Sequence, residues 1–179
     1  IIPYPRNVRF YNEKRTFLPL SKPLVYKSIM PPARPETNSN VSWVKPEQVE
    51  AMRDAAHEGR HGIRDEAIVT MLYDTGLRRA ELSDVDRGMV DVDVEELRVP
   101  PRIQKDFPND NTPNPATFEL DQSGDLRTLR ALRSYLNTRD DDQAPLFLSQ
   151  KNTRLTGKAI NDVVKRLAER ASLRPYGYD

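Results

Sequence analysis

The nine residues DTGLRRAEL at 74–82 decide the fold of this chain, because one helix ends in them and another begins. Gly76 is of the residue type that most often follows the last turn of a helix. Arg78 and Arg79 then stand where a new helix starts, although that end of a helix is partly positive and favours acidic residues. A charge that opposes the local preference is sometimes kept for a ligand, and the surrounding sequence has to show whether this one is.

Helical periodicity continues on both sides of these residues. Apolar side chains recur at intervals of three and four, Pro46 suits a first helical position, and Ser123 and Thr156 suit helix caps. We expect helices over 46–57, 64–75, 78–85 and 124–138, and a last one after Thr156. Their buried faces are expected to hold Val49, Met52, Ala56, Ile68, Val69, Leu72, Tyr73, Leu126, Leu129, Leu132, Leu136, Ile160, Val163, Val164 and Leu167.

Between the third and fourth of these helices the apolar period falls to two. This pattern predicts three short antiparallel strands over 89–92, 96–99 and 117–120. A loop rich in proline and asparagine, at 100–115, joins the last two strands and contains Lys105. The expected fold class is therefore α+β and mostly helical, with helices packed around a small three-stranded antiparallel sheet.

The composition excludes several kinds of site. The 179 residues include no cysteine, which rules out disulfides, thiolate nucleophiles and cysteine metal ligands. The two histidines, His57 and His61, cannot form a multi-histidine centre, and the acidic run at 140–142 is interpreted as an exposed turn, so we expect no metal and no cofactor. No apolar run approaches the roughly 18 residues of a membrane span, which predicts a soluble, cytoplasmic protein without a membrane partner.

The first 41 residues differ from the rest in composition. They hold seven of the 15 prolines, and residues 1–45 contain eight Lys and Arg against two Asp and Glu, whereas 46–179 contain 20 against 25. We interpret 1–41 as an extended basic arm or interdomain linker, which is either a solvated tail or a strap that follows a polyanion. Because the chain begins with Ile1 rather than methionine, we expect a fragment of a longer protein.

The order of these elements resembles the catalytic domain of the tyrosine recombinases, the phage-integrase family. The most specific part is TGLRRAEL at 75–82, which follows an RDEA segment at 64–67. Downstream, APLFLS at 144–149 and LTGKAI at 155–160 resemble further segments of the family in the same order. The resemblance covers about 42–179, which we expect to be a partial catalytic domain.

Members of that family cleave and rejoin DNA through a tyrosine hydroxyl that attacks a backbone phosphate, giving a 3′-phosphotyrosine link and a free 5′-hydroxyl. The resemblance implies that Arg78 holds the scissile phosphate and that Lys105 protonates the departing 5′-oxygen, with an ordinary exposed loop lysine as the alternative for Lys105. Glu81, three residues after Arg78 on one helical face, is expected to orient that guanidinium. An arginine suits the phosphate because its fork donates two parallel hydrogen bonds and stays charged.

Other basic residues are weaker candidates. Arg154 and Lys158 flank the start of the last helix, where they either contact DNA phosphates or form a solvated face. Arg79 is expected at the solvent or at the edge of the DNA. By resemblance, the partners are double-stranded DNA and further copies of the protein on paired DNA sites, with no small-molecule substrate, so the protein is expected to be nucleoid-associated.

The family's His-x-x-Arg box and the nucleophilic tyrosine beyond it have no counterpart in this sequence. Tyr176 and Tyr178 precede the position of the box, so we expect a chain that binds DNA and is unable to cleave it alone. Two alternatives stay open. One is a non-catalytic DNA-binding or regulatory protein on the same scaffold; the other is a helical protein-interaction domain with no DNA role, which is consistent with the net charge of −5 over 46–179.

Overall fold

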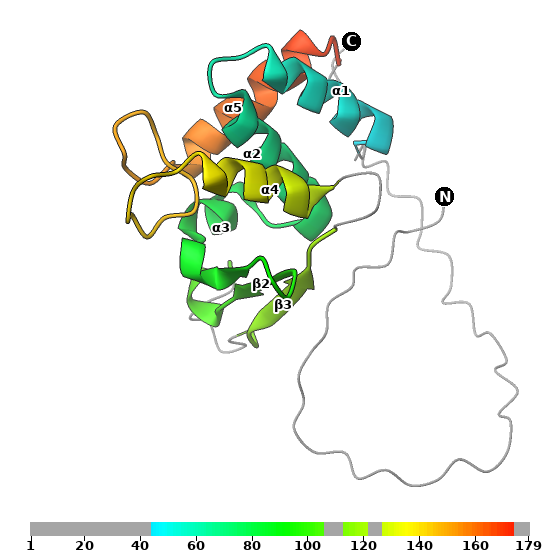
Figure 1. The fold of residues 1–179 in the computed structure, drawn as a ribbon. Helices are drawn as coiled ribbons and strands as arrows, with labels where there is room; N and C mark the ends of the chain where they lie inside the picture. The colour runs from blue at the N-terminus through cyan, green and yellow to red at the C-terminus, as the bar shows by residue number, and fades with distance from the viewer. Residues whose placement is uncertain (1–43, 106–112, 122–126, 174–179) are drawn as a thin grey trace, which may run out of the picture. The chain divides into compact units, whose positions relative to one another are not determined.

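The computed structural model describes residues 44–105, 113–121 and 127–173 (Figure 1). The expected arm at 1–41 lies outside the described residues, and so do Ser123 and Leu126. Within these three ranges, none of the helices combines the length and the apolar character needed to cross a bilayer. The same ranges contain no group of three or more acidic or histidine side chains placed to hold a metal ion.

Each of the expected helices has a counterpart. They are α1 (Pro46–His57), α2 (Gly62–Thr75), α3 (Arg79–Asp84), α4 (Thr128–Asn137) and α5 (Gly157–Arg170). The expected start of the fourth helix at 124 is wrong, because Arg127 has a φ of 49° in the left-handed region and cannot continue a helix. The cap expected of Thr156 is confirmed, since its hydroxyl accepts a hydrogen bond from the backbone N–H of Ala159 at 3.2 Å.

Three short strands form one antiparallel sheet in the order β1-β2-β3. They are β1 (Val90–Asp91), β2 (Glu96–Val99) and β3 (Ala116–Glu119), with Leu97 opposite both Val90 and Phe118. The first strand is shorter than expected at both ends. A 3-10 turn, η1 (Arg87–Met89), occupies its start, and the Asp91 carboxylate accepts the N–H groups of Asp93 and Val94, which turns the chain away from the strand direction. The expected α+β class with a three-stranded antiparallel sheet is confirmed.

The core is built around α2, which packs against α1, α4 and α5 (Figure 1). The largest side chains that lie fully inside it are Ile68, Met71, Leu82, Leu97, Leu129, Leu132, Leu146, Ile160 and Leu167. Burying each such side chain contributes about 1.5–3 kcal/mol. Most of the residues expected on the buried faces are buried, whereas Leu72, Tyr73, Leu136 and Val164 are only half-buried.

Two acidic residues of α2 are buried with the core, and both are paired. Arg53 of α1 donates from Nε and Nη2 to the Glu66 carboxylate at 3.2 and 2.8 Å. Arg64 donates to one oxygen of Asp65, and Arg166 of α5 donates to the other at 2.6 Å. The RDEA segment at 64–67 therefore ties α2 to α1 through an ion pair that lies largely out of the solvent, and to α5 through Arg166, whose side chain is 43% exposed.

The acidic turn after α4 is fixed by a second buried arginine. Arg139 donates from Nη1 to the carbonyl oxygens of Pro145 and Leu146 at 2.7 and 2.9 Å, and from Nε to Asp141 at 2.9 Å. This ion pair lowers the pKa of Asp141 to about 2. The Asp141 carboxylate also accepts the N–H of Gln143, so it holds the turn that leads into residues 146–148.

Asp141→Asn is expected to flatten the acid side of the stability curve. The folded-state pKa of Asp141 lies below its ordinary value of 3.8, so its contribution to folding is fully present above about pH 4. That contribution is lost as the pH falls toward 2, where the carboxylate becomes protonated in the folded state as well. Urea unfolding between pH 5 and pH 2 should show a smaller loss of stability for the variant than for the wild type.

The matched control for this measurement is Asp140→Asn, which removes the same charge from the exposed neighbouring position. It should keep the pH dependence of the wild type. Parallel curves for the wild type and Asp141→Asn would show that the Arg139–Asp141 pair adds nothing to stability.

Candidate active site

Arg78 is held at the junction between α2 and α3. The chain leaves α2 through Gly76, which has a φ of 65° and so supplies the left-handed turn expected of it. Leu77 is buried and anchors the junction, and the next residue, Arg78, is the N-cap of α3, with extended backbone. The Arg78 side chain is 58% exposed, so its guanidinium is open to a ligand from the solvent side.

Glu81 lies behind Arg78, and its carboxylate accepts three hydrogen bonds while being only 7% exposed. One oxygen accepts the backbone N–H of Arg78 at 2.7 Å. The other accepts Nη1 of the Arg78 guanidinium at 3.2 Å and the backbone N–H of Lys105 at 3.0 Å. A carboxylate at this position also suits the positive end of a helix. Glu81 therefore caps α3 and contacts both residues for which the family resemblance implies a catalytic role.

Lys105 lies in the segment that follows β2, and this segment brings its backbone to the same carboxylate oxygen of Glu81 that Arg78 contacts. A single 3-10 turn, η2 (Pro101–Ile103), redirects the backbone, and Gln104 donates to the carbonyl oxygens of Val99 and Asn114 at 3.3 and 2.9 Å, which spans the two sides of the loop. The Lys105 side chain is exposed. Residues 106–112 of the expected loop lie outside the described residues. The backbone of Lys105 is fixed by Glu81, while its ammonium is on the solvent side.

Arg154 and Lys158 do not share one environment. Arg154 is 35% exposed, and it donates to the carbonyl oxygen of Ser83 at 2.8 Å and to the Asp86 carboxylate at 2.5 Å. Lys158 is exposed in the first turn of α5. This turn packs closely on α3, since a Cβ at Gly157 would lie 3.3 Å from the carbonyl oxygen of Arg79. Lys158 is thus near the start of α3, while Arg154 contacts its other end.

One further basic residue of this region, Arg102, is not among the candidates that the sequence indicates. Arg102 lies on η2, three residues before Lys105, and is exposed, with its Nη2 atom 3.8 Å from the Asp86 carboxylate. The spacing from Arg102 to Lys105 was visible in the sequence as two cations in a proline-rich loop. Its closeness to α3 was not visible, because it depends on how the loop folds back.

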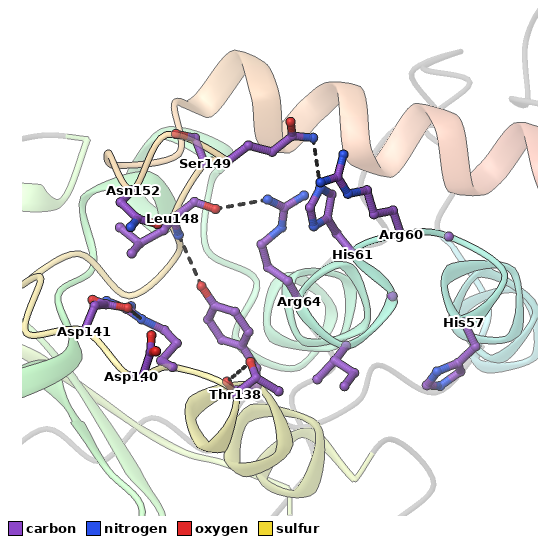
Figure 2. Close-up of a pocket in the computed structure, with 16 residues that line it drawn as sticks. His57, Arg60, His61, Arg64, Thr138, Asp140, Asp141, Leu148, Ser149 and Asn152 are labelled. Carbon is purple, nitrogen blue, oxygen red and sulfur yellow. Dashed lines mark hydrogen bonds and ion pairs between the residues drawn. The ribbon is translucent and has the colours of Figure 1, made fainter.

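A separate open pocket of about 550 Å³ lies where the α1–α2 turn faces the end of α4 and residues 148–152 (Figure 2). His61 and Gln150 are in hydrogen-bond contact across it at 2.9 Å, and burial together with the nearby Arg64 charge lowers the pKa of His61. None of the candidate residues around Arg78 lines this pocket. The candidate site lies at Arg78 instead, where the buried Glu81 carboxylate contacts both an exposed guanidinium and the backbone of Lys105.

Residues 42–177 match the model of the phage integrase family, so the chain belongs to that family. Among curated relatives, it is 32% identical over 117 residues to a tyrosine recombinase XerC of Herpetosiphon aurantiacus, which covers 64% of this chain and 35% of the relative. It is 31% identical over 114 residues to a tyrosine recombinase XerA of Thermococcus onnurineus, covering 62% and 36%.

The chain spans about a third of the length of these relatives. A solved structure, the crystal structure of XerA recombinase, shares the fold with a TM-score of 0.60 at 21% identity, and the match covers 76% of this chain and 45% of that one. The family expected from the sequence is confirmed.

Glu81→Ala is expected to destabilise the fold by about 1–3 kcal/mol, because the backbone N–H groups of Arg78 and Lys105 would lose their acceptor at a site that is largely closed to water. Urea unfolding of the described chain measures this loss. The control is Glu47→Ala, which removes an acidic residue from the first turn of α1 but at an exposed position, and which should change stability by no more than about 0.5 kcal/mol. Equal small effects of the two substitutions would contradict the role given to Glu81.

Proposed function

We propose that this chain is the part of a site-specific DNA recombinase that holds the scissile phosphate, in a reaction that cleaves and rejoins strands through a 3′-phosphotyrosine intermediate. Arg78 binds the phosphate, Lys105 protonates the departing 5′-oxygen, and Glu81 positions both. The observation that carries the proposal is the Glu81 carboxylate, which contacts the Arg78 guanidinium and the Lys105 backbone at once. Family membership supports the same assignment.

The chemistry explains why an arginine is needed at this point. The tyrosine hydroxyl gives up its proton to a base that is not assigned among the described residues, and its oxygen attacks the phosphorus. One P–O bond forms and the bond to the 5′-oxygen breaks, while negative charge builds on the two non-bridging oxygens. A guanidinium already fixed at that place stabilises the charge without reorganisation. The 5′-oxygen leaves as a hydroxyl only if it receives a proton, and the Lys105 ammonium supplies one. The attacking tyrosine is not assigned among the described residues.

Double-stranded DNA is the proposed partner, and self-association on paired DNA sites is proposed with it. The candidate phosphate contacts around the scissile position are Arg78, Arg102 and Lys158, which come from three different segments near α3. Residues 42–179 then form the catalytic portion, and 1–41 act as a linker. The alternative function is that of a non-catalytic DNA-binding or regulatory protein, which would use the same surface. A cleavage assay distinguishes this function from that of a recombinase.

DNA binding is tested by fluorescence anisotropy with a labelled duplex between 50 and 200 mM salt. Affinity should fall steeply with salt, because each neutralised phosphate releases counterions. Arg78→Ala should reduce the slope of log affinity against log salt by about one. The control is Arg170→Ala, which removes a cation at the far end of α5, about 20 Å along that helix from its first turn.

Arg170→Ala should keep the slope of the wild type. A chain with no affinity for duplex DNA at 50 mM salt would refute the proposed function and would favour a protein-interaction domain.

A further inference from the structure

We propose that Arg154 is a positioning residue, which together with Asp86 fixes the C-terminal end of α3 and the segment that carries Lys105. This inference rests on the proposed function, because it concerns how Arg78 and Lys105 are held relative to each other. It departs from the expectation that Arg154 contacts DNA.

The short helix α3 depends on contacts from outside the helix. A helix of six residues has too few internal hydrogen bonds to be stable alone, and its last carbonyl groups have no partner within the helix. Arg154 supplies partners at that end, since Nη1 donates to the carbonyl oxygens of Ser83 and Val85 at 2.8 and 3.3 Å. A cation at the C-terminal end of a helix also suits the helix dipole. Glu81 fixes the start of α3, and Arg154 fixes its end.

Asp86 lies between two arginines, Arg154 and Arg102. One carboxylate oxygen accepts Nη2 of Arg154 at 2.5 Å, and the other lies 3.8 Å from Nη2 of Arg102. Arg102 belongs to η2, which ends two residues before Lys105. The Lys105 segment therefore contacts α3 through a hydrogen bond to Glu81 at the start of the helix, and Arg102 lies within ion-pair distance of Asp86 just beyond its end.

The backbone on which Arg154 stands is fixed by hydrogen bonds to neighbouring segments. Its backbone pairs with Leu148, and the N–H of Leu155 donates to the carbonyl oxygen of Phe147 at 2.9 Å. The hydroxyl of Ser83 in turn donates to the carbonyl oxygen of Leu155 at 2.8 Å. Phe147 and Leu155 both belong to the core. The guanidinium of Arg154 thus extends from a rigid base, which a positioning role requires.

The test that needs no DNA is amide hydrogen exchange in the chain described here. Arg154→Gln and Asp86→Asn should each raise the exchange rates of the Arg78 and Lys105 amides by about tenfold, because both amides depend on the geometry at Glu81. The Arg154→Gln/Asp86→Asn double variant should show little more than either single change, since the two residues act as one unit.

Arg170→Ala serves as the control for these exchange rates and should leave them unchanged. Unchanged exchange in the Arg154 and Asp86 variants would overturn the proposal. If Arg154→Gln does not fold, Arg154→Lys, which keeps the charge and loses the fork, takes its place with the same expected direction.

The second readout is the salt slope of duplex binding. Arg154→Gln should keep the wild-type slope, whereas Lys158→Ala should lower it by about one. A slope lowered by about one for Arg154→Gln would identify a phosphate contact and overturn the positioning role. If the wild-type chain shows no salt-dependent affinity, the proposed function fails, and the exchange rates still decide whether Arg154 and Asp86 position α3.

Discussion

Arg78→Ala, placed in a protein that continues through a His-x-x-Arg box and a tyrosine, is expected to slow strand cleavage by about 10²–10³. Duplex affinity should fall only a few-fold, because one phosphate contact among several is lost. In the proposed function, the Arg78 guanidinium, which is 58% exposed and in contact with Glu81, meets the charge that develops on the phosphate, and this accounts for the large effect on rate. Single-turnover cleavage of a labelled duplex, with saturating protein, gives the rate directly.

The matched control is Arg79→Ala, at the next position along the chain. Arg79 is exposed in the first turn of α3, and its guanidinium makes no hydrogen bond to another described residue, so its loss should change the cleavage rate by less than about threefold. Arg78→Lys should be intermediate, because it keeps the charge and loses the fork. Equal rates for wild type and Arg78→Ala would contradict the assignment of Arg78.

Glu66→Ala is expected to destabilise the fold by about 3–5 kcal/mol. Arg53 and Glu66 are each 8% exposed, so removing the carboxylate leaves a charged guanidinium enclosed between α1 and α2, with the more exposed Glu50 carboxylate as its remaining partner. The Nε2 atom of His57 lies 3.2 Å from the other oxygen of the Glu66 carboxylate. Urea unfolding near neutral pH measures the change in the free energy of unfolding.

Glu50→Ala is the control for Glu66→Ala because the same Arg53 donates to it, at 2.6 Å, while the Glu50 side chain is 45% exposed. A pair in contact with water contributes about 0–1 kcal/mol, so this variant should stay within that range. The double variant Arg53→Met/Glu66→Leu should recover most of the stability lost in Glu66→Ala, since neither charge then remains buried. Equal losses for Glu50→Ala and Glu66→Ala would show that burial of the pair has no energetic consequence.

Helix boundaries are predictable from the sequence where the apolar spacing agrees with the Pro and Gly residues at the helix ends. Over α1 and α2, Pro46, Gly76 and the apolar spacing all favour the same boundaries, and the structure has them within two residues. It failed where a single local interaction ends an element. Arg127 adopts a left-handed conformation before α4, and the Asp91 side chain turns the chain after β1, and neither event changes the apolar pattern.

The candidate site was predictable only as far as local spacing reaches. Arg78 and Glu81 are three residues apart, so their contact follows from a helix start. The bond from Lys105 to Glu81 crosses 24 residues and depends on how η2 and the sheet close onto α3. Arg154 shows the same limit, because a sequence states its charge and not that its guanidinium turns inward to Asp86.

We propose above all that the surface around Arg78 serves strand cleavage through a covalent bond to tyrosine. The most direct measurement uses a nicked suicide duplex, in which the cleaved fragment diffuses away, with the protein extended through a His-x-x-Arg box and a tyrosine. We predict a protein–DNA adduct that survives denaturation, carries DNA by its 3′ end and leaves a free 5′-hydroxyl. The Arg78→Ala variant should not form this adduct. Tight duplex binding without any adduct, or an adduct that forms equally in Arg78→Ala, would contradict the account.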